Sequence, residues 1–431
     1  MQQKYLMTRN TAVRPRIVAM EYQVLGHYPD YIRNIAEQWH LSSWDAEIEF
    51  IVSNRFASIH GEADQAVRSF RDDRIHITPV SQDEEEGILR QGRQHYFGWE
   101  LFRKYCAKSN AAHGLLMYLD NFQLPIWLGK KLTCSFSAIY FRPTFHYHRY
   151  LHHRPSFLQR LVSLRKKWFM KQVLRCSQLK ELYVLDPTAI DYIRNHFRTH
   201  VRISHFADTF SPYPSRPDRI AEIRRELGIE MGRKVFTLLG VLDSRKGPIE
   251  LLQSVSHLDN DTASKMTLML LGYTPDDYVE KVNAAYEVAK KRSSLQLIYE
   301  NRFIPGTDVQ NYFAASDVIL TTYQGHMGSS LALIRAAAEG KPLLSSNFGT
   351  VGELVEQRRL GITVDSTDPR SIARGITRLM TEVPRFDSHE AKRIVDENSC
   401  EQLRRDLARM FDFCSTPAGD PVNEVACGEQ S

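Results

Sequence analysis

The stretch from 323 to 355 holds the residues of this chain that are best suited to bind an anion. An apolar run of strand length precedes it, and the small residues Gly328, Ser329 and Ser330 then open a predicted helix over 331–339. Serine is a favoured N-cap, and free amides at a helix N-terminus bind phosphate groups. The segment therefore predicts a phosphate or sugar-nucleotide site. The simpler interpretation is an ordinary β-α-β unit with a capped helix.

Strands and helices alternate along most of the chain, which predicts an α/β fold with two Rossmann-like domains and a cleft between them. Three prolines within 211–218 mark the best domain boundary. We expect a disordered N-terminus over 1–14, an N-terminal domain over 15–213, a C-terminal domain over 214–385, one terminal helix over 386–413, and a disordered tail over 414–431. Residues 81–94 are expected to form a polar, partly acidic linker or loop.

The composition is that of an ordinary globular protein. The 431 residues are 42 % hydrophobic and 25 % charged, with a net charge of +5. No run approaches the roughly 18 apolar residues of a membrane span, and the basic N-terminus lacks the apolar core of a secretory signal. The six cysteines are scattered without a CxxC pair, so we expect a reduced, cytoplasmic setting and no structural zinc site.

Two residues of the first half are candidates because of their place beside strands. Gly26 lies in the loop between the first strand and the first helix. Nucleotide-type α/β domains begin with a strand, a glycine-containing loop and a helix. Asp120 follows the buried strand over 114–119, at the sheet edge where open parallel sheets bind ligands. It is either a functional carboxylate or the N-cap of a helix predicted over 124–132.

Residues 142–180 differ in composition from the rest of the chain. They contain ten arginines and lysines, no acidic residue, and an apolar stripe that includes Leu161, Leu164 and Trp168. A basic amphipathic helix with aromatic residues suits an anionic membrane surface or an anionic acceptor. The alternative is a solvated helix packed on the domain. Nucleic acid is disfavoured, since no recognised RNA- or DNA-binding module accompanies the patch.

Several short motifs of the second half belong together: Gly240, Arg245-Lys246-Gly247, Leu271-Gly272, the stretch 312–320, Gly328 to Pro342, Ser345 to Glu353, and Leu360-Gly361. This set resembles the C-terminal domain of GT-B glycosyltransferases, specifically the large retaining group called family 4. The resemblance implies that 15–213 is an acceptor domain and 214–385 a donor domain. It covers roughly 219–380, whereas the first half matches by architecture and Gly26 alone.

The resemblance implies transfer of a hexose from a nucleotide-sugar, with the sugar nucleotide as substrate and no cofactor or metal. Lys246 is then the cation that stabilises the departing diphosphate, Gly247 lets the backbone approach, and the amides before the helix form the cradle. The plain alternative for Lys246 is a solvent-exposed loop lysine. Asp120 is the first-domain candidate near the reacting carbon. A retaining, front-face mechanism requires no enzyme nucleophile, and we assign none.

Three further residues are candidates for donor binding. His326 is expected to hydrogen-bond a sugar hydroxyl or phosphate, or else to serve a packing role in its loop. Arg335 either reaches the diphosphate or ribose, or pairs with Glu339 four residues on. Glu353 resembles the family's glutamate in that segment, and either touches the donor sugar or caps its own helix.

The chain departs from the family at positions that matter. The family usually has two glutamates eight positions apart, and Met327 and Arg335 stand there. An arginine that often precedes the lysine is replaced by Val241. The run from Gln324 to Ser330 is similar to that of a bacterial branch with its own motif, which favours an active, divergent enzyme.

Two rival functions remain, a non-catalytic GT-B binding or scaffold protein and a sugar-nucleotide epimerase. The favoured acceptor is a lipid-linked or polysaccharide precursor, with peripheral contact at the inner membrane face through 142–180.

Overall fold

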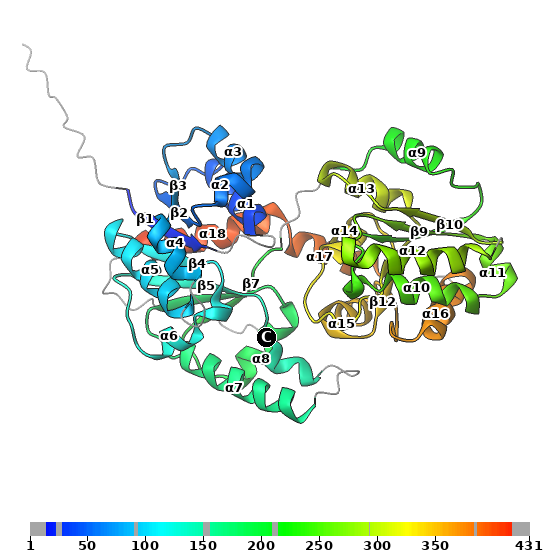
Figure 1. The fold of residues 1–431 in the computed structure, drawn as a ribbon. Helices are drawn as coiled ribbons and strands as arrows, with labels where there is room; N and C mark the ends of the chain where they lie inside the picture. The colour runs from blue at the N-terminus through cyan, green and yellow to red at the C-terminus, as the bar shows by residue number, and fades with distance from the viewer. Residues whose placement is uncertain are drawn as a thin grey trace, which may run out of the picture.

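The computed structural model describes residues 14–22, 28–89, 94–149, 156–208, 214–292, 294–382 and 386–415. It contains two domains, each built on an open parallel sheet that helices cover (Figure 1). This is the α/β architecture that the alternation of predicted strands and helices indicated.

The first sheet has the strand order β3-β2-β1-β4-β5-β6-β7. Its strands are β1 (Arg16–Glu21), β2 (Glu47–Val52), β3 (Ile75–Pro79), β4 (His113–Leu116), β5 (Ser135–Tyr140), β6 (Leu179–Val184) and β7 (Arg202–His205). The helices of this domain are α1 (Tyr28–His40), α2 (Phe56–Ile59), α3 (Gly61–Ser69), α4 (Gln82–Leu89), α5 (Gln94–Lys108), α6 (Gln123–Trp127), α7 (Phe157–Val173) and α8 (Pro187–His196), with the 3-10 turns η1 (Leu119–Asn121) and η2 (Thr144–Arg149).

The second sheet has the order β10-β9-β8-β11-β12-β13. Its strands are β8 (Lys234–Leu239), β9 (Met266–Leu271), β10 (Gln296–Glu300), β11 (Val318–Thr321), β12 (Leu343–Ser346) and β13 (Gly361–Val364). Its helices are α9 (Pro217–Glu226), α10 (Pro248–Ser254), α11 (Asn260–Ser264), α12 (Asp276–Lys290), α13 (Gly306–Ala315), α14 (Leu331–Ala338), α15 (Gly349–Gln357) and α16 (Pro369–Thr381), with η3 (Ser244–Lys246) and η4 (Val255–His257). The last elements of the described residues are α17 (Ser388–Glu397) and α18 (Cys400–Ser415).

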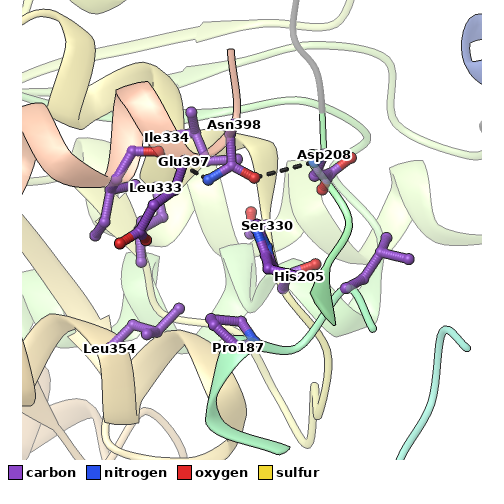
Figure 2. Close-up of a pocket in the computed structure, with 12 residues that line it drawn as sticks. Pro187, His205, Asp208, Ser330, Leu333, Ile334, Leu354, Glu397 and Asn398 are labelled. Carbon is purple, nitrogen blue, oxygen red and sulfur yellow. Dashed lines mark hydrogen bonds between the residues drawn. The ribbon is translucent and has the colours of Figure 1, made fainter. Parts of the chain in front are cut away.

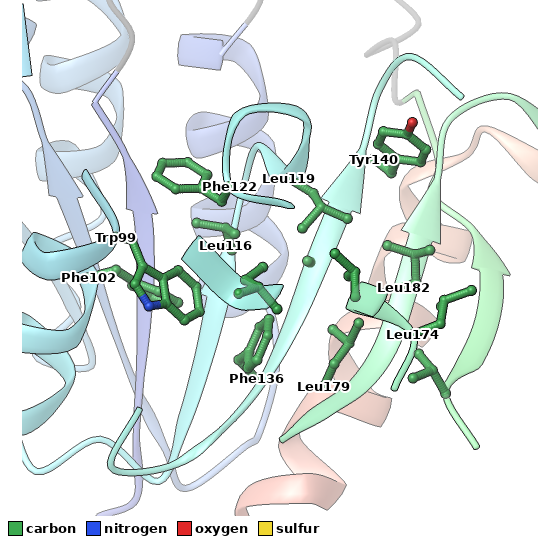
Figure 3. Packing of buried hydrophobic residues seen from close by; sticks show 14 of the residues in the cluster. Trp99, Phe102, Leu116, Leu119, Phe122, Phe136, Tyr140, Leu174, Leu179 and Leu182 are labelled. Atoms are coloured by element: carbon green, nitrogen blue, oxygen red, sulfur yellow. The ribbon is translucent and has the colours of Figure 1, made fainter. Parts of the chain in front are cut away.

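Apolar side chains fill both faces of the central strands. Every residue of β9 is buried, as are the last five residues of β1. Figure 3 shows one face of the first sheet, where the rings of Trp99 and Phe136 lie 5.7 Å apart among leucines from β4 and β6. Strands buried on both faces form when helices cover a parallel sheet from both sides, which explains their continuous apolar sequences.

The strand order reverses once in each sheet, and the reversal decides which loops become neighbours. In the second sheet β8 pairs with β9 on one side and with β11 on the other. The loop after β8 carries Lys246, and the loop after β11 carries Gly328 to Ser330. Ligands of open α/β sheets bind at such a switch point, at the carboxyl ends of the strands. The topology therefore brings these two loops together.

The last helix returns to the first domain. Leu403, Leu407 and Met410 of α18 belong to the apolar cluster that covers one face of the first sheet, and Tyr183 of β6 donates a hydrogen bond to Asp406 O at 3.1 Å. A single terminal helix over 386–413 was expected, and the structure has two. The break follows from Ser399, whose Oγ accepts from the amide of Gln402 at 3.1 Å and so starts a new helix.

The polar stretch 81–94 was expected to be a linker or loop, and this prediction was wrong over its first part. Residues 82–89 form α4. The Ser81 amide donates to the Glu84 carboxylate at 2.8 Å, and the Glu84 amide donates to Ser81 Oγ at 3.3 Å. This is a capping box, and the S-x-x-E spacing was its sequence signal.

The ends predicted to be disordered lie almost wholly outside the described residues. Two described parts of them are ordered: Arg14 pairs with Asp45 and Asp73 at 2.9 Å each, and α18 continues to Ser415. None of the helices in the described ranges is both long enough and apolar enough to cross a bilayer.

The packing of α18 generates the first prediction. All five tryptophans lie between 39 and 168, so their fluorescence reports the first domain alone. We expect Leu407→Ala to lower the free energy of unfolding by about 2–5 kcal/mol in urea titrations followed by tryptophan emission, because a fully buried leucine is lost. Leu41→Ala, at a side chain 58 % exposed, is the control and should change it by less than about 0.5 kcal/mol. Equal effects would contradict the docking of α18.

Candidate functional site

A lysine is held inside the loop that follows β8. The N-cap of η3, Asp243, accepts a hydrogen bond from the Lys246 amide at 3.1 Å. Gly247 then adopts φ +70°, and a Cβ at this residue would lie 2.7 Å from Thr322 O. The turn directs the Lys246 side chain inward, where the residue is only 9 % exposed. The interpretation of Lys246 as a solvent-exposed loop lysine is therefore wrong.

Tyr323 connects this lysine to the N-terminus of α14. Lys246 Nζ donates to Tyr323 Oη at 2.7 Å and lies 4.3 Å from the ring centroid. The Tyr323 hydroxyl is 3.0 Å from Oγ of Ser330, which caps α14 by accepting from the Ala332 amide at 3.3 Å. Either hydroxyl can be the donor in the bond between Tyr323 and Ser330. Sequence reasoning missed Tyr323, since no spacing relates positions 246 and 323.

The residues predicted to form the cradle occupy one loop. Gly328, Ser329 and Ser330 stand directly before α14. His326 Nε2 lies 3.1 Å from Ser329 O, and because a carbonyl oxygen only accepts, Nε2 carries the proton. Its ring also meets the Tyr323 ring edge-on, with centroids 5.4 Å apart. The histidine thus shapes the loop whose amides were expected to bind the anion.

The start of α15 holds this loop from the other side. The amide and hydroxyl of Thr350 lie 3.1 Å and 2.9 Å from Met327 O. Gly349 has φ +75°, and a Cβ there would stand 2.2 Å from His326 O. Only glycine permits so close an approach. The turn at Gly349 is therefore a support for the cradle.

One carboxylate of the first domain reaches across to the second. Asp186, after β6, caps α8 by accepting from the Thr188 amide at 3.0 Å, and its other oxygen lies 3.0 Å from the Thr350 hydroxyl. The same oxygen lies 3.3 Å from His146 Nε2. Burial opposes its ionisation, but the hydrogen bonds from His146, Thr188 and Thr350 outweigh burial and lower the pKa of Asp186. Sequence reasoning missed Asp186, although Asp-Pro at a strand end is a helix-start signal.

Positive charge gathers around His326 from both domains. Burial lowers the pKa of His326, and Arg245, Lys246 and Arg142 lower it further, while the hydrogen bond to Ser329 opposes them. Arg142 follows β5 in the first domain, whereas the other two cations follow β8. Three cations acting on one neutral imidazole create a potential that attracts anions to the domain boundary.

Arg335 and Glu353 lie on the two helices beside the cradle. Burial lowers the pKa of Arg335, and the carboxylate of Asp30 in the first turn of α1 raises it. Glu339, the pairing partner considered for Arg335, accepts from Gln310 at 2.7 Å. Glu353 lies a full turn inside α15, where it accepts from Gln357 at 2.5 Å. It therefore lies beyond the N-cap position of α15, which Phe348 occupies.

Asp120 has a structural task that neither expectation described. Its two oxygens accept from the amides of Phe141 and Arg142, at 2.9 Å and 3.0 Å, directly after β5. It does not cap α6, which begins at Gln123 without a side-chain cap. Removal from water raises the pKa of Asp120 to about 6, against the effect of both amides. Its role is to hold the turn that positions Arg142. Gly26 lies outside the described residues.

A small cavity lies behind the cradle, between the domains. Figure 2 shows its lining, in which Ser330 and Leu354 of the second domain face Pro187 and His205 of the first. Its volume of about 30 Å³ admits about two waters, so it is no nucleotide site. Asn398 borders it and accepts from the Asp208 amide at 3.0 Å. These residues set how the two domains meet.

The hydroxyl of Tyr323 is a stability determinant that mutation can test. We expect Tyr323→Phe to lower the free energy of unfolding of the second domain by about 1–3 kcal/mol, because the buried ammonium loses its nearest acceptor. Tyr273→Phe, in the same domain, removes an exposed hydroxyl and serves as the control. Differential scanning calorimetry of both variants measures the difference, and equal midpoints would contradict the assignment.

The cavity wall also predicts a pH dependence. Burial lowers the pKa of His205 to about 4, although backbone hydrogen bonds to Leu185 and Glu397 and the charge of Asp186 oppose it. An unfolded histidine titrates near 6.5, so the unfolded chain binds the proton first and stability is lost from about pH 6.5 down to about 4. In urea titrations we expect the stability difference between the protein and His205→Gln to shrink across this window. A difference independent of pH would refute this.

Comparisons with known proteins agree with this geometry. Residues 219–398 match the family model described as glycosyl transferases group 1. A relative named putative glycosyltransferase YtcC, from Bacillus subtilis, is 29 % identical over 160 residues, which is 37 % of this chain and 39 % of that protein. The chain thus spans less than half the length of this curated relative.

Solved structures match over nearly the whole length. Sucrose-phosphate synthase from Thermosynechococcus elongatus has a TM-score of 0.66 at 15 % identity, covering 93 % of this chain and 98 % of that one. HepE from Anabaena, solved in complex with UDP, has a TM-score of 0.62 at 14 % identity, covering 92 % and 99 %. At such identities the likeness concerns the fold. The chain has the GT-B fold, and its second domain is similar to the glycosyl transferases group 1 over residues 219–398.

Proposed function

We propose that this protein transfers a hexose from a nucleotide-sugar to an acceptor, a saccharide or lipid-linked precursor of a polysaccharide, with retention at the sugar carbon and without a metal. The family match of the second domain supports glycosyl transfer. The solved structure of HepE contains UDP, which supports a nucleotide-sugar as donor.

The observation that carries the proposal is the hydrogen-bonded path from Lys246 through Tyr323 to Ser330, with steps of 2.7 Å and 3.0 Å. Glycosyl transfer leaves a nucleoside diphosphate, whose negative charge grows as the bond to the sugar breaks. A fixed ammonium group and a helix N-terminus with its partial positive charge favour that charge. Because their partners already hold them in place, no reorganisation is required during the reaction.

A cation of the first domain adds to the positive charge around the cradle. Arg142 acts on the same His326 as Lys246 and Arg245. When the domains meet around a donor, the diphosphate is thus approached by cations from both sides. In this proposal the protein cations, and not a metal, balance the diphosphate charge, so activity is retained in excess chelator.

The retaining course is proposed from what the carboxylates do. Asp120 accepts two backbone hydrogen bonds, and Asp186 caps α8 and meets Thr350. Both are engaged in holding turns, which supports a route in which the leaving phosphate receives the acceptor proton. The product of a chosen sugar donor should therefore keep the donor's anomeric configuration, as NMR of the product can establish.

The proposal is tested by incubating the purified protein with UDP- and GDP-sugars and measuring nucleoside diphosphate release. We expect Lys246→Ala to lower the turnover about 100- to 1,000-fold, since it removes a preorganised donor from the leaving phosphate. Lys290→Ala is a matched control, because that lysine also lies over a tyrosine ring, 5.8 Å from its centroid, but on α12. Turnover unchanged in Lys246→Ala would overturn the assignment.

A non-catalytic binding protein is the second candidate, favoured by Met327 and Arg335 at the positions where the family usually has glutamates. Thermal-shift measurements separate the two functions, because a ligand of the native state raises the melting temperature. Binding of a sugar nucleotide without turnover, unchanged in Arg335→Glu, would favour the binding protein.

A further inference from the structure

Helix α7 presents an apolar stripe to solvent. Phe157, Leu161, Leu164 and Trp168 follow one another at spacings of four, three and four residues, which places them on one face of a helix. Phe157 is 77 % exposed and Leu164 63 % exposed, while Leu161 and Trp168 are also exposed. An apolar stripe on a surface helix normally faces the core. This one faces away from it.

The opposite face of α7 accounts for the packing of the helix on the domain. Met170 and Val173 are buried, Ser163 donates to Phe145 O at 3.4 Å, and Lys166 Nζ donates to Thr144 Oγ1 at 2.8 Å. These contacts attach α7 to its own domain without Phe157, Leu161 or Leu164 of the stripe. A capping box closes the N-terminus of the helix: Ser156 Oγ accepts from the Gln159 amide, and Gln159 accepts from the Ser156 amide at 2.8 Å.

The stripe continues onto α6. The Trp127 ring meets Trp168 edge-on, with centroids 5.0 Å apart, and both rings are partly exposed. Leu128 follows Trp127 and is exposed too. We call this surface the α6–α7 face, made of Trp127, Leu128, Phe157, Leu158, Leu161, Leu164 and Trp168. In Figure 1 the two helices lie at the lower edge of the first domain.

Cations border the α6–α7 face on both sides. Arg160 and Lys171 flank one side of the stripe and Arg165 the other, and all three are exposed. No acidic residue lies between 142 and 180. Asp191, on the exposed side of α8, is the nearest acidic residue along the chain that is not buried. An exposed apolar surface with aromatic rings at its centre and cations at its edge is complementary to an anionic lipid bilayer.

We propose that the α6–α7 face is a docking surface for an anionic lipid bilayer, on which α7 lies in the plane of the membrane with its stripe among the acyl chains. Tryptophan suits the boundary between acyl chains and headgroups because its ring is apolar and its N–H is polar. The arginines and lysines remain level with the lipid phosphates. The binding is reversible, since one amphipathic helix does not anchor a protein irreversibly.

The docked orientation would bring the bilayer to the first-domain side of the site. Lys166 contacts Thr144, two residues after Arg142, and the charges of Asp120 and Arg142 both act on this lysine. Resting on the proposed function, this geometry selects an acceptor whose lipid portion stays in the membrane while its polar group reaches the domain boundary.

The test is flotation of the full chain with vesicles of phosphatidylcholine containing about a third phosphatidylglycerol, compared with phosphatidylcholine alone. We expect binding to the anionic vesicles and a blue shift of tryptophan emission. The variant Phe157→Ser/Leu161→Ser/Leu164→Ser should weaken binding about 100-fold. The variant Arg160→Gln/Arg165→Gln/Lys171→Gln should weaken it by a similar factor at low salt. At high salt this second variant and the unchanged protein should bind equally, because salt screens the cations. These side chains are exposed, so the variants should fold normally, which circular dichroism checks.

Val288→Ser is the matched control, because it removes a side chain 66 % exposed on α12 of the other domain. It should bind vesicles as the unchanged protein does. Absence of vesicle binding, or equal binding of the Phe157→Ser/Leu161→Ser/Leu164→Ser variant, would overturn the proposal. So would concentration-dependent dimers that this variant abolishes, because the face would then be covered by a second copy of the chain.

The result is independent of glycosyl transfer. Sugar-nucleotide binding is followed by thermal shift in solution, where we expect the unchanged protein and the Phe157→Ser/Leu161→Ser/Leu164→Ser variant to behave alike. Vesicle binding without any nucleotide response would support the docking surface while refuting the proposed function. A thermal shift with sugar nucleotides but no vesicle binding would support the proposed function and refute the docking surface.

Discussion

The ammonium group of Lys246 is the charge on which the candidate site depends. A buried cation is costly unless it is paired or hydrogen-bonded, and here the hydroxyl and the ring face of Tyr323 supply the nearest contacts. The same hydroxyl is bonded to the cap of α14. The lysine, the tyrosine and the start of the helix therefore form one unit, which β8 and β11 hold together because they are adjacent in the sheet.

The domains are joined by polar contacts as well as by the chain that links them. Asp186 caps a helix of the first domain and meets Thr350, whose amide and hydroxyl also contact the cradle loop. Asn398 contacts the amide of Asp208 just before α18 returns to the first domain. A small shift between the domains would therefore move Thr350 and, with it, the cradle loop. This is the physical connection by which closure around a donor would position both sets of cations.

The stripe on α7 is unusual because it faces solvent in the part of the chain that the structure describes. Core-facing residues hold the helix, while four large apolar side chains on the other face increase the hydrophobic surface in contact with water. Such exposure is costly to solubility unless a partner covers it. The cationic border limits the chemistry of that partner. Catalysis and membrane contact would then belong to two different surfaces of one domain pair.

The sequence by itself determined the features that depend on local order along the chain. The alternation of apolar strands with helices predicted two parallel-sheet domains, and Gly328 to Ser330 marked a helix N-terminus. Such signals are local, since capping and periodicity act within a few residues. The capping box at Ser81 and the N-cap at Ser399 are local signals of the same kind.

Only the tertiary structure decided the contacts between distant segments. It brought Tyr323 to Lys246, Asp186 to Thr350 and α18 to the first sheet, and it gave Asp120 a task in holding the turn after β5. These pairs are separated by tens to hundreds of residues. Their proximity follows from the strand order of each sheet and from the way the two domains meet, and neither is expressed in the spacing of residues along the chain.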